Sequence, residues 1–303
     1  MEPHNRLRTV AGVFGSLYAL EEIRLSDNLL FAVTEEWFGS APSLKTIHLE
    51  RNVISGIADD ALQPLKRLSR LYLGHNFLTQ VKVSYFRFNV ALASLSLDHN
   101  HISEIERGSF KGTPRLRELR LHDNNIRAIT RELFSSLSQL GELHLQNNKL
   151  AAIEPQAFGS LGDLQHLDLT GNRLLKLEDI MMRYPSALRT LHLDENRLGS
   201  FHRETFSGQT TTEILSLSNN KLEKLPAKVF EELINLFRLN LSRNRILEIE
   251  DLALVGLHQL RYLDLSFNRL AHLSNLTLRG LQQAEQGRDW LEHSNPHMKP
   301  KSF

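Results

Sequence analysis

The stretch LRELRLHDNNIRAI, residues 116–129, places leucines at short regular intervals before two adjacent asparagines, Asn124 and Asn125. One of the two belongs to a series that recurs every 24 residues, eleven times along the chain, which selects Asn124 rather than Asn125. The complete series is Asn28, Asn52, Asn76, Asn100, Asn124, Asn148, Asn172, Asn196, Asn220, Asn244 and Asn268. An internal repeat is therefore the feature that decides the fold.

The copies follow the frame L-x-x-L-x-L-x-x-N-x-L, except that the first leucine is Thr212 in the ninth copy, and an apolar residue stands ten positions after each asparagine. That position holds Phe38, Phe86, Phe110, Phe134, Phe158, Phe206 and Phe230, with Leu62, Met182, Leu254 and Leu278 in the other copies. The x-L-x-L segment has the alternation of a short strand, and the remainder must turn back over the opposite side. One copy cannot bury its leucines alone, so we expect stacked copies with parallel strands.

The repeated asparagine has a structural role in this arrangement. A carboxamide both donates and accepts hydrogen bonds, so at the turn after each strand it satisfies backbone groups of its own and adjacent turns. We therefore expect a ladder of buried asparagines along the stack, formed by the eleven residues of the 24-residue series.

The frame, the period and the phenylalanine column resemble the leucine-rich-repeat family, in the 24-residue type found in animal extracellular proteins and receptor ectodomains such as Toll-like receptors. The resemblance covers about residues 5–281. It implies an α/β solenoid, a right-handed horseshoe of about eleven full repeats. Its concave side would carry a parallel β-sheet, and its convex side loops and short 3₁₀ or helical segments. It also implies binding of a ligand or protein.

Composition sets further limits on function. Lys plus Arg (36) balance Asp plus Glu (35), so no overall charge indicates nucleic acid or a membrane surface. The absence of cysteine excludes disulfides and thiolate metal sites, and no apolar run is long enough to span a bilayer. We expect a solenoid over residues 1–281 and a polar, flexible tail over 282–303. Because the cysteine-rich caps of extracellular family members are missing, we expect a fragment of a longer protein.

Variable strand positions are predicted to form the binding surface on the concave sheet. The candidates mix charge, hydrogen-bonding groups and one aromatic ring without a large apolar patch, which suits a protein or glycan ligand. They are Arg24, His48, Tyr72, Arg120, His122, His144, Asp168, His192 and Asp194.

A second column, formed by the residue after each ladder asparagine, is basic in the last six repeats. It consists of Lys149, Arg173, Arg197, Lys221, Arg245 and Arg269. Two readings stay open: a stripe for an anionic partner such as a sulfated glycan, or ordinary solvated side chains whose stems cover apolar turns. The second is favoured.

Histidines and sequons add weaker signals. His99 and His101 flank Asn100, and His122 follows one repeat later, a pattern compatible with a metal site or with a pH-responsive face. Solvated side chains are the favoured interpretation, and no metal and no cofactor are predicted. Two glycosylation sequons start at Asn240 and Asn275. Asn275, expected on the return segment, is the better acceptor.

No hydrolase, kinase, P-loop or metalloprotease motif occurs, so we expect a protein that is not an enzyme. Nothing resembles a nucleic-acid-binding module. The first hypothesis is a non-catalytic binding module of a cell-surface receptor or extracellular protein, without membrane insertion by this segment. The alternatives are a cytosolic leucine-rich-repeat scaffold and a structural or adhesion protein that associates with itself through uncapped ends. Immune, adhesion and matrix roles are not separable at this level.

Overall fold

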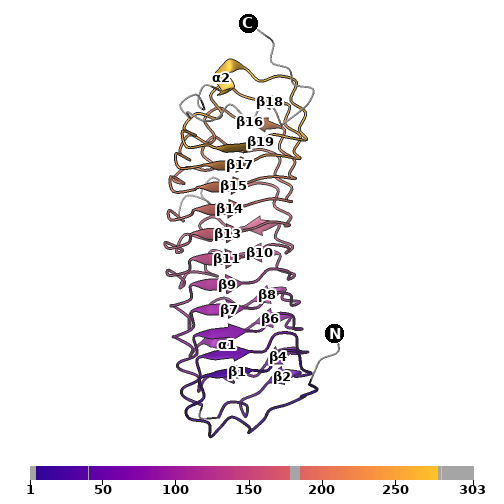
Figure 1. Cartoon of the computed structure of the whole chain (residues 1–303), viewed down its shortest axis with the longest axis vertical. Helices are drawn as coiled ribbons and strands as arrows, with labels where there is room; N and C mark the ends of the chain where they lie inside the picture. The colour runs from indigo at the N-terminus through magenta and orange to yellow at the C-terminus, as the bar shows by residue number, and fades with distance from the viewer. Residues whose placement is uncertain (1–4, 40, 178–184, 279–280, 282–303) are drawn as a thin grey trace. The chain divides into compact units, whose positions relative to one another are not determined.

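The computed structural model describes residues 5–39, 41–177, 185–278 and 281. The chain forms two compact units, residues 1–164 (unit 1) and residues 165–303 (unit 2). The position of Met182 and the tail expected over 282–303 lie outside the described residues. Within each unit, successive coils of chain stack on one another with very little helix, as the repeat predicts (Figure 1).

Unit 1 is built on a parallel sheet of three-residue strands in which each strand pairs with the strand one repeat away. These strands are β1 (Glu22–Arg24), β3 (Thr46–His48), β5 (Arg70–Tyr72), β7 (Ser94–Ser96), β9 (Glu118–Arg120) and β11 (Glu142–His144). Two-residue strands on the return side are β2 (Ala32–Val33), β4 (Gly56–Ile57), β6 (Gln80–Val81), β8 (Glu104–Ile105), β10 (Ala128–Ile129) and β12 (Ala152–Ile153). One helical turn, α1 (Val83–Phe86), follows β6.

Unit 2 repeats this plan. Its parallel sheet consists of β13 (His166–Asp168), β14 (Thr190–His192), β15 (Ile214–Ser216), β17 (Arg238–Asn240) and β19 (Tyr262–Asp264). Its return strands are β16 (Lys224–Leu225) and β18 (Glu248–Ile249), and a helical turn, α2 (Asn275–Leu278), comes near the end. Among the described residues, no helix has the length and apolarity required to cross a bilayer.

The register of both sheets equals the sequence period. Leu71 pairs with Leu95, and Leu191 pairs with Leu215, so residues 24 positions apart stand side by side. Because side chains alternate between the two faces of a strand, the central residue of every three-residue strand, a leucine or an isoleucine, points inward and is buried. The first and last residues of each strand are left to the opposite face. The sequence frame therefore converts directly into columns of equivalent side chains.

The return strands explain an apolar position that the sequence alone left without a role. An aliphatic residue five positions after the ladder asparagine forms the second residue of each return strand, as Val81 does in β6 and Ile129 does in β10. Those strands pair in twos across neighbouring repeats. This pairing satisfies backbone groups on the return side, which was expected to contain only loops and short helical turns.

Aromatic rings fill the space between the sheet and the return side. Phe110, Phe134 and Phe158 are fully buried. Their rings stack, with centroids 6.2 Å apart for the first pair and 6.3 Å for the second. Unit 2 repeats the contact between Phe206 and Phe230, at 5.7 Å. Each coil thus covers the apolar surface of the next one.

The repeated asparagines lie at the turn that leaves each strand. Asn124 is typical: its Nδ2 donates to the carbonyl of Leu121 in its own turn and to that of Leu97 one repeat earlier, at 3.1 and 2.9 Å. Its Oδ1 accepts the backbone N–H of Ile102 at 2.9 Å. Ten of the eleven asparagines are buried, and Asn268 is half-buried.

Candidate functional site

The exposed face of the unit 1 sheet carries the candidate residues at the strand ends. Arg24, His48, Tyr72, Arg120 and His144 are the last residues of their strands, and strand pairing places them in one column with Ser96. The two arginines are exposed, the other three candidates are half-buried, and Ser96 is buried. The column is thus a mixed polar surface on a rigid backbone.

Interactions within this column fix several of its side chains. The ring of His48 stacks on that of Tyr72 with centroids 4.7 Å apart, and its Nδ1 lies 3.2 Å from a carboxylate oxygen of Glu50. The Arg120 side chain bonds Glu118 on the same strand, with Nε to Oε1 at 2.6 Å. Held in this way, the groups offer a preformed surface instead of one that must order on binding.

A recess of 330 Å³ opens in the unit 1 face, and Gly74 lines it at a position where other repeats have a longer side chain. The same repeat position holds Glu50, Asp98 and Gln146 elsewhere in the unit. A Cβ on Gly74 would lie 2.9 Å from the carboxylate of Asp98, so the glycine leaves room for this carboxylate. The recess is lined by Ser26, His48, Glu50, Arg51, Tyr72, Gly74, His75, Ser96, Asp98 and Arg120.

The face of unit 2 is centred on Asp194, which follows β14. Its Oδ1 accepts the backbone N–H of Ser218 at 2.8 Å and the Ser218 hydroxyl at 2.6 Å, and it also accepts the Ser216 hydroxyl. Burial opposes ionisation of Asp194, but hydrogen bonds from His192 and the two serines outweigh it, so its pKa lies below the ordinary value. Its hydrogen bond with His192 in turn raises the pKa of that imidazole, against the effect of burial. Asp168 pairs with His192 in the register and adds to that rise.

Three of the nine candidates therefore gather in unit 2 as a charged pair with an acidic neighbour. Asp194 is mostly occupied in holding the backbone of the next repeat, so part of its role is structural. Its position in the repeat predicts a binding residue, but its hydrogen bonds to Ser216 and Ser218, one repeat away, follow only from the structure.

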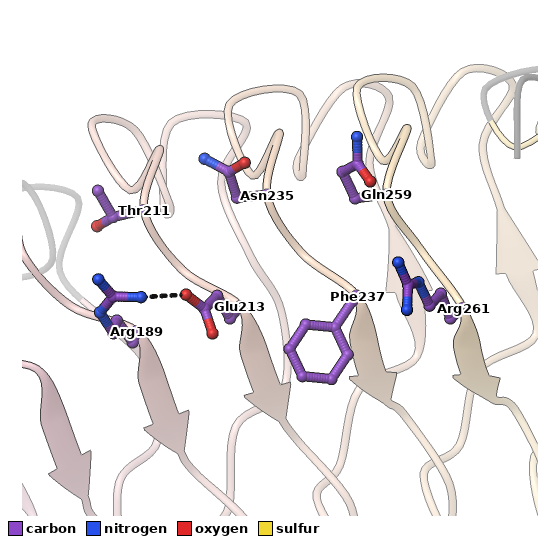
Figure 2. A pocket seen from close by; sticks show the side chains of 7 residues that line it. All are labelled: Arg189, Thr211, Glu213, Asn235, Phe237, Gln259 and Arg261. Atoms are coloured by element: carbon purple, nitrogen blue, oxygen red, sulfur yellow. Dashed lines mark hydrogen bonds and ion pairs between the residues drawn. The ribbon is translucent and has the colours of Figure 1, made fainter.

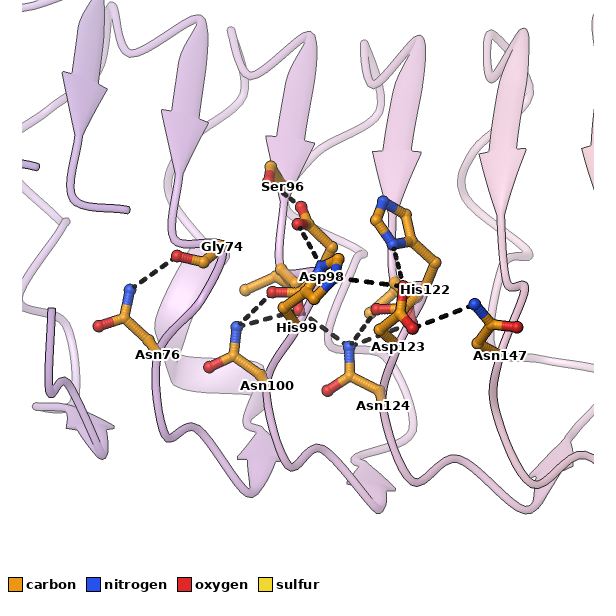
Figure 3. A network of polar contacts seen from close by, with 12 residues as sticks. Gly74, Asn76, Ser96, Asp98, His99, Asn100, His122, Asp123, Asn124 and Asn147 are labelled. Carbon is orange, nitrogen blue, oxygen red and sulfur yellow. Dashed lines mark hydrogen bonds and ion pairs between the residues drawn. The ribbon is translucent and has the colours of Figure 1, made fainter. Parts of the chain in front are cut away.

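A dense polar cluster lies at the turn edge of unit 1, where the chain leaves the strands (Figure 3). His99 contacts two carboxylates: its Nδ1 lies 3.1 Å from Oδ2 of Asp98, and its Nε2 lies 3.5 Å from Oδ2 of Asp123. His122 Nδ1 lies 2.9 Å from the same oxygen of Asp123. The ring of His75 stacks on that of His99 at 4.0 Å. Burial and the neighbouring His99 lower the pKa of His75.

Only one member of this cluster, His122, was among the predicted site residues. His101, which the sequence analysis considered together with His99, contacts the ring of Phe77 instead. The residue before each ladder asparagine is the signal that was missed. His75, His99 and Asp123 all occupy that position in consecutive repeats, and it adopts a positive φ of 50–56° in the three.

The basic column is exposed in unit 2, at Arg173, Arg197, Lys221, Arg245 and Arg269, and half-buried at Lys149 of unit 1. A shallow recess of 550 Å³ in unit 2 includes Lys221, Arg245 and Arg269 of this column. Two residues that the sequence analysis did not select also line it: Arg243 and Phe267, whose guanidinium and ring stack at 4.7 Å.

A further hollow of 480 Å³ lies at the opposite edge of the unit 2 sheet, where strands begin (Figure 2). Arg189 and Glu213 pair across it, with Nη1 to Oε1 at 2.5 Å. Its lining consists of Arg189, Thr211, Glu213, Asn235, Phe237, Gln259 and Arg261. Four of these recur at intervals of 24 residues just before each strand, a column that sequence reasoning could have found.

The two sequons differ in accessibility. Asn275 is exposed in α2. Asn240 is half-buried at the end of β17, and its Oδ1 accepts the N–H and the hydroxyl of Ser242 at 3.0 and 2.8 Å. Glycan attachment at either position remains a prediction.

Comparison with known proteins identifies the repeat. A family model described as leucine rich repeat matches residues 18–78, 66–126, 114–174, 186–246 and 234–285. These matches cover most of the chain. A search of curated protein sequences gave no match.

Solved structures with similar folds include receptors and a bacterial protein. A structure of the Toll–Spatzle complex of Drosophila matches with TM-score 0.72 and 26% identity, covering 83% of this chain and 35% of that chain. A leucine-rich-repeat protein of Leptospira interrogans matches with TM-score 0.77 and 28% identity, over 88% of this chain and 66% of that one. The TLR13–ssRNA13 complex matches with TM-score 0.56 and 20% identity, over 92% and 57%. The chain thus spans about a third of the Toll chain and under two thirds of the others.

Proposed function

The chain belongs to the leucine-rich-repeat family, and on that premise we propose that it is a non-catalytic module that binds a protein or glycan through the exposed sheet face of unit 1. The observation that carries the proposal is the recess at Gly74. Ten residues of mixed chemistry border it, among them the His48–Tyr72 stack and the carboxylate of Asp98. Small-molecule and side-chain recognition uses concave sites of this kind, with a few fixed polar groups around an opening.

Similar folds bear on the class of partner. The matched Toll structure is a complex with Spatzle, and at 26% identity it supports a protein partner for this chain. The TLR13 structure contains RNA, but at 20% identity the similarity supports a shared fold and not a shared ligand. The nearly balanced charge of this chain, 36 basic against 35 acidic residues, favours recognition by local patches over an electrostatic match to a polyanion. A protein or glycan remains the partner that we propose.

The test fills the recess without altering the scaffold. Gly74→Gln places at this position the side chain that Gln146 has at the equivalent position in unit 1. Gly74 has no positive φ, so its backbone accepts a side chain, but the new Cβ displaces the carboxylate of Asp98. The matched control is Thr170→Gln, the same repeat position in unit 2. The probes are a panel of purified extracellular proteins and a glycan array.

We expect the wild-type chain and Thr170→Gln to bind the same probes, and Gly74→Gln to lose them, with unchanged thermal denaturation in all three. Equal binding by all three proteins would move the site away from the recess. The absence of any bound probe would contradict the proposed partner class.

We further propose that the chain is part of a cell-surface receptor or extracellular protein. The support is the phenylalanine-containing 24-residue repeat, whose rings form the stacked columns described above. An antibody to the chain should stain intact cells that express the protein from its full-length transcript. Staining only after permeabilisation would favour the cytosolic scaffold.

Exposed apolar side chains near the start of unit 1 favour self-association as a second candidate. Val13, Leu17 and Tyr18 are 56%, 43% and 64% exposed. Such patches mark interaction sites. Light scattering should show a mass that rises with concentration, and the triple variant Val13→Ser, Leu17→Ser, Tyr18→Ser should remain monomeric. A constant monomer mass for the wild-type chain would remove this candidate.

A further inference from the structure

The turn edge of unit 1 brings three good metal ligands around one point. The donor atoms of His99, His122 and Asp123 all lie within 4.8 Å of one another. His99 Nε2 and His122 Nδ1 lie 3.5 and 2.9 Å from the shared Oδ2 of Asp123. Ligand atoms of a tetrahedral zinc ion, at bond lengths of about 2.0–2.2 Å, are separated by roughly 3.3–3.5 Å. Small side-chain rotations bring the three atoms to that spacing.

Hydrogen bonds from neighbouring side chains orient these ligands. Asp98 lies 3.1 Å from Nδ1 of His99. Its other oxygen accepts the hydroxyl of Ser96. With the Nδ1 proton donated to Asp98, the lone pair of His99 is on Nε2, the atom that faces Asp123. Asn147 Nδ2 donates to the remaining Asp123 oxygen, Oδ1, at 3.1 Å. Metal-binding histidines and carboxylates are commonly held by outer partners of this kind, which fix the tautomer and the ring orientation.

The backbone holds the cluster in place as well. His99 and Asp123 occupy equivalent positions of consecutive repeats, each immediately before a buried ladder asparagine. The backbone N–H of His99 donates to the carbonyl of His122 at 3.0 Å, which joins the two turns directly. The side chains are nevertheless open to solvent, with 40% of His99, 33% of Asp123 and 18% of His122 exposed. An ion therefore has access to a site that is largely preformed.

We propose that His99 Nε2, His122 Nδ1 and an Asp123 carboxylate oxygen bind a late first-row divalent cation, zinc in particular, with Asp98 as the outer-shell partner of His99. Two imidazoles and one carboxylate form a ligand set suited to zinc, and water would complete a tetrahedral site. The three ligands do not line the recess at Gly74, although Asp98 borders both, and the proposal does not depend on the proposed function. It revises the prediction from sequence that no metal is bound.

Other metal-ligand clusters among the described residues are less suitable. His75, Asp98 and His99 also lie within 4.8 Å of one another, but that arrangement uses His99 Nδ1 and leaves Asp98 as a ligand instead of an orienting group. Glu118, Glu142 and His144 form a third cluster. Its Glu118 is bonded to the Arg120 side chain, whose positive charge opposes a cation.

The experiment is isothermal titration calorimetry of the full chain with zinc chloride in a buffer that does not chelate metals. Cobalt(II) titration with visible spectroscopy reports the geometry. The ligand variants are His99→Asn, which tolerates the positive φ, and His122→Gln. Asp98→Asn tests the outer shell. His101→Gln and His75→Gln are the controls, because neither residue is a ligand in the proposed site.

We expect one zinc ion per chain and the strong visible bands of tetrahedral cobalt. Each ligand variant should weaken the zinc Kd by at least about 10-fold, and Asp98→Asn should weaken it by about 10- to 100-fold. The two controls should bind like the wild type. Thermal denaturation without zinc should be the same for all variants, which separates loss of a ligand from loss of the fold.

Three results would overturn the assignment. One is the absence of stoichiometric zinc binding by the wild-type chain. Another is equal binding by every variant, which would indicate adventitious binding by scattered surface histidines. The third is loss of binding in His75→Gln with retention in His122→Gln, which would place the ion on the opposite side of His99.

Discussion

The turn edges of units 1 and 2 share one backbone and differ in chemistry. In both, the residue before every ladder asparagine has a positive φ. In unit 1 that position places His75 against His99 and His99 against Asp123, as a row of imidazoles that ends on a carboxylate. In unit 2 it places Arg243 beside Phe267, a cation on an aromatic ring. The ladder thus fixes the position of the residue before each asparagine, and the type of residue at that position decides what the turn edge can bind.

The residue types at this position differ in how readily they adopt a positive φ. Asparagine and aspartate adopt positive φ readily, and Asp27, Asp123 and Asn147 of unit 1 fit this preference. Arg51 of unit 1 and Arg243 and Phe267 of unit 2 have φ of 53°, 55° and 54°, although these residue types rarely adopt such values. Phe267 is also 72% exposed. Every repeat has the positive φ at this position, so the stacked contact and the exposed ring, and not backbone strain, make the Arg243–Phe267 pair a second surface to examine.

The largest loss of stability is expected from a substitution among the buried phenylalanine rings, which occur in both units. Phe134 is fully buried between the rings of Phe110 and Phe158. Phe134→Ala should lower the free energy of unfolding by about 3–5 kcal/mol, because it removes transfer energy and leaves a cavity. Urea denaturation followed by circular dichroism measures this loss. A loss below about 1 kcal/mol would mean that the coils do not depend on shared packing.

The second-largest loss of stability is expected from the asparagine ladder. Asn148→Ala leaves the carbonyls of Leu121 and Leu145 and the N–H of Ile126 without their side-chain partner. Since unpaired buried polar groups are destabilising, the expected loss is about 1–3 kcal/mol. Asn125→Ala, at an asparagine outside the ladder series, is the control.

Asn268 gives the matching comparison within the ladder. It makes the same bonds, to the carbonyls of Leu241 and Leu265, but it is only half-buried, so water can replace it. Asn268→Ala should therefore be less destabilising than Asn148→Ala in the same urea experiment. Equal losses would show that hydrogen bonding, and not burial, sets the value of each ladder position.

The parts of the molecule that sequence could predict are those in which one residue type has one role. Leu71 and Leu191 are inward because alternation requires it, and the column of Tyr72 follows from the 24-residue register. The metal-ligand cluster could not be predicted in this way. His99 reaches Asp123 of the next repeat only because a positive φ turns each of these residues toward its neighbour. The spacing of histidines suggested His101 instead, whose side chain turns toward Phe77.

The charged pair of unit 2 should make stability depend on pH. The raised pKa of His192 stabilises the fold below the ordinary value of 6.5, and this contribution is lost as pH rises through the raised value. The lowered pKa of Asp194 stabilises the fold above 3.8, and this contribution is lost as pH falls through the lowered value. Both contributions to stability are therefore fully present between about pH 3.8 and 6.5. His166, whose ring lies 5.7 Å from that of His192, and Asp168 also face it.

His192→Gln should cost about 0.5–1 kcal/mol near pH 5.5 and less near pH 8.5, because the pair is partly screened by solvent. Urea denaturation at both pH values measures the difference. His258→Gln, at an exposed histidine of unit 2, is the control and should show no such difference. A larger cost near pH 8.5 than near pH 5.5 would reverse the assigned direction of the pKa shift.

A reciprocal exchange sharpens the comparison of backbone strain. Glu195 and Asn219 occupy the position before consecutive ladder asparagines, both exposed, with φ of 54° and 53°. Glu195→Asn should stabilise the chain by roughly 0.5–1 kcal/mol, and Asn219→Glu should destabilise it by a similar amount. Thermal denaturation measures both. Shifts of the same sign would mean that side-chain contacts, not the backbone, decide stability at this edge.

The smallest effect is expected for the basic column of unit 2. Arg197 and Arg245 are exposed and two repeats apart, so at a strand spacing of about 4.8 Å their charges are separated by roughly a Debye length and largely screened. If the column is ordinary solvated surface, the double variant Arg197→Glu plus Arg245→Glu should elute from a heparin column at a lower salt concentration than the wild type. The decrease should equal that of a double variant with two arginines replaced elsewhere on the surface. Arg67→Glu plus Arg115→Glu is the matched control, since these exposed arginines are also 48 residues apart. A clearly larger loss for the unit 2 pair would establish the column as an anion-binding stripe, and it would then join Arg243 and Phe267 in one surface.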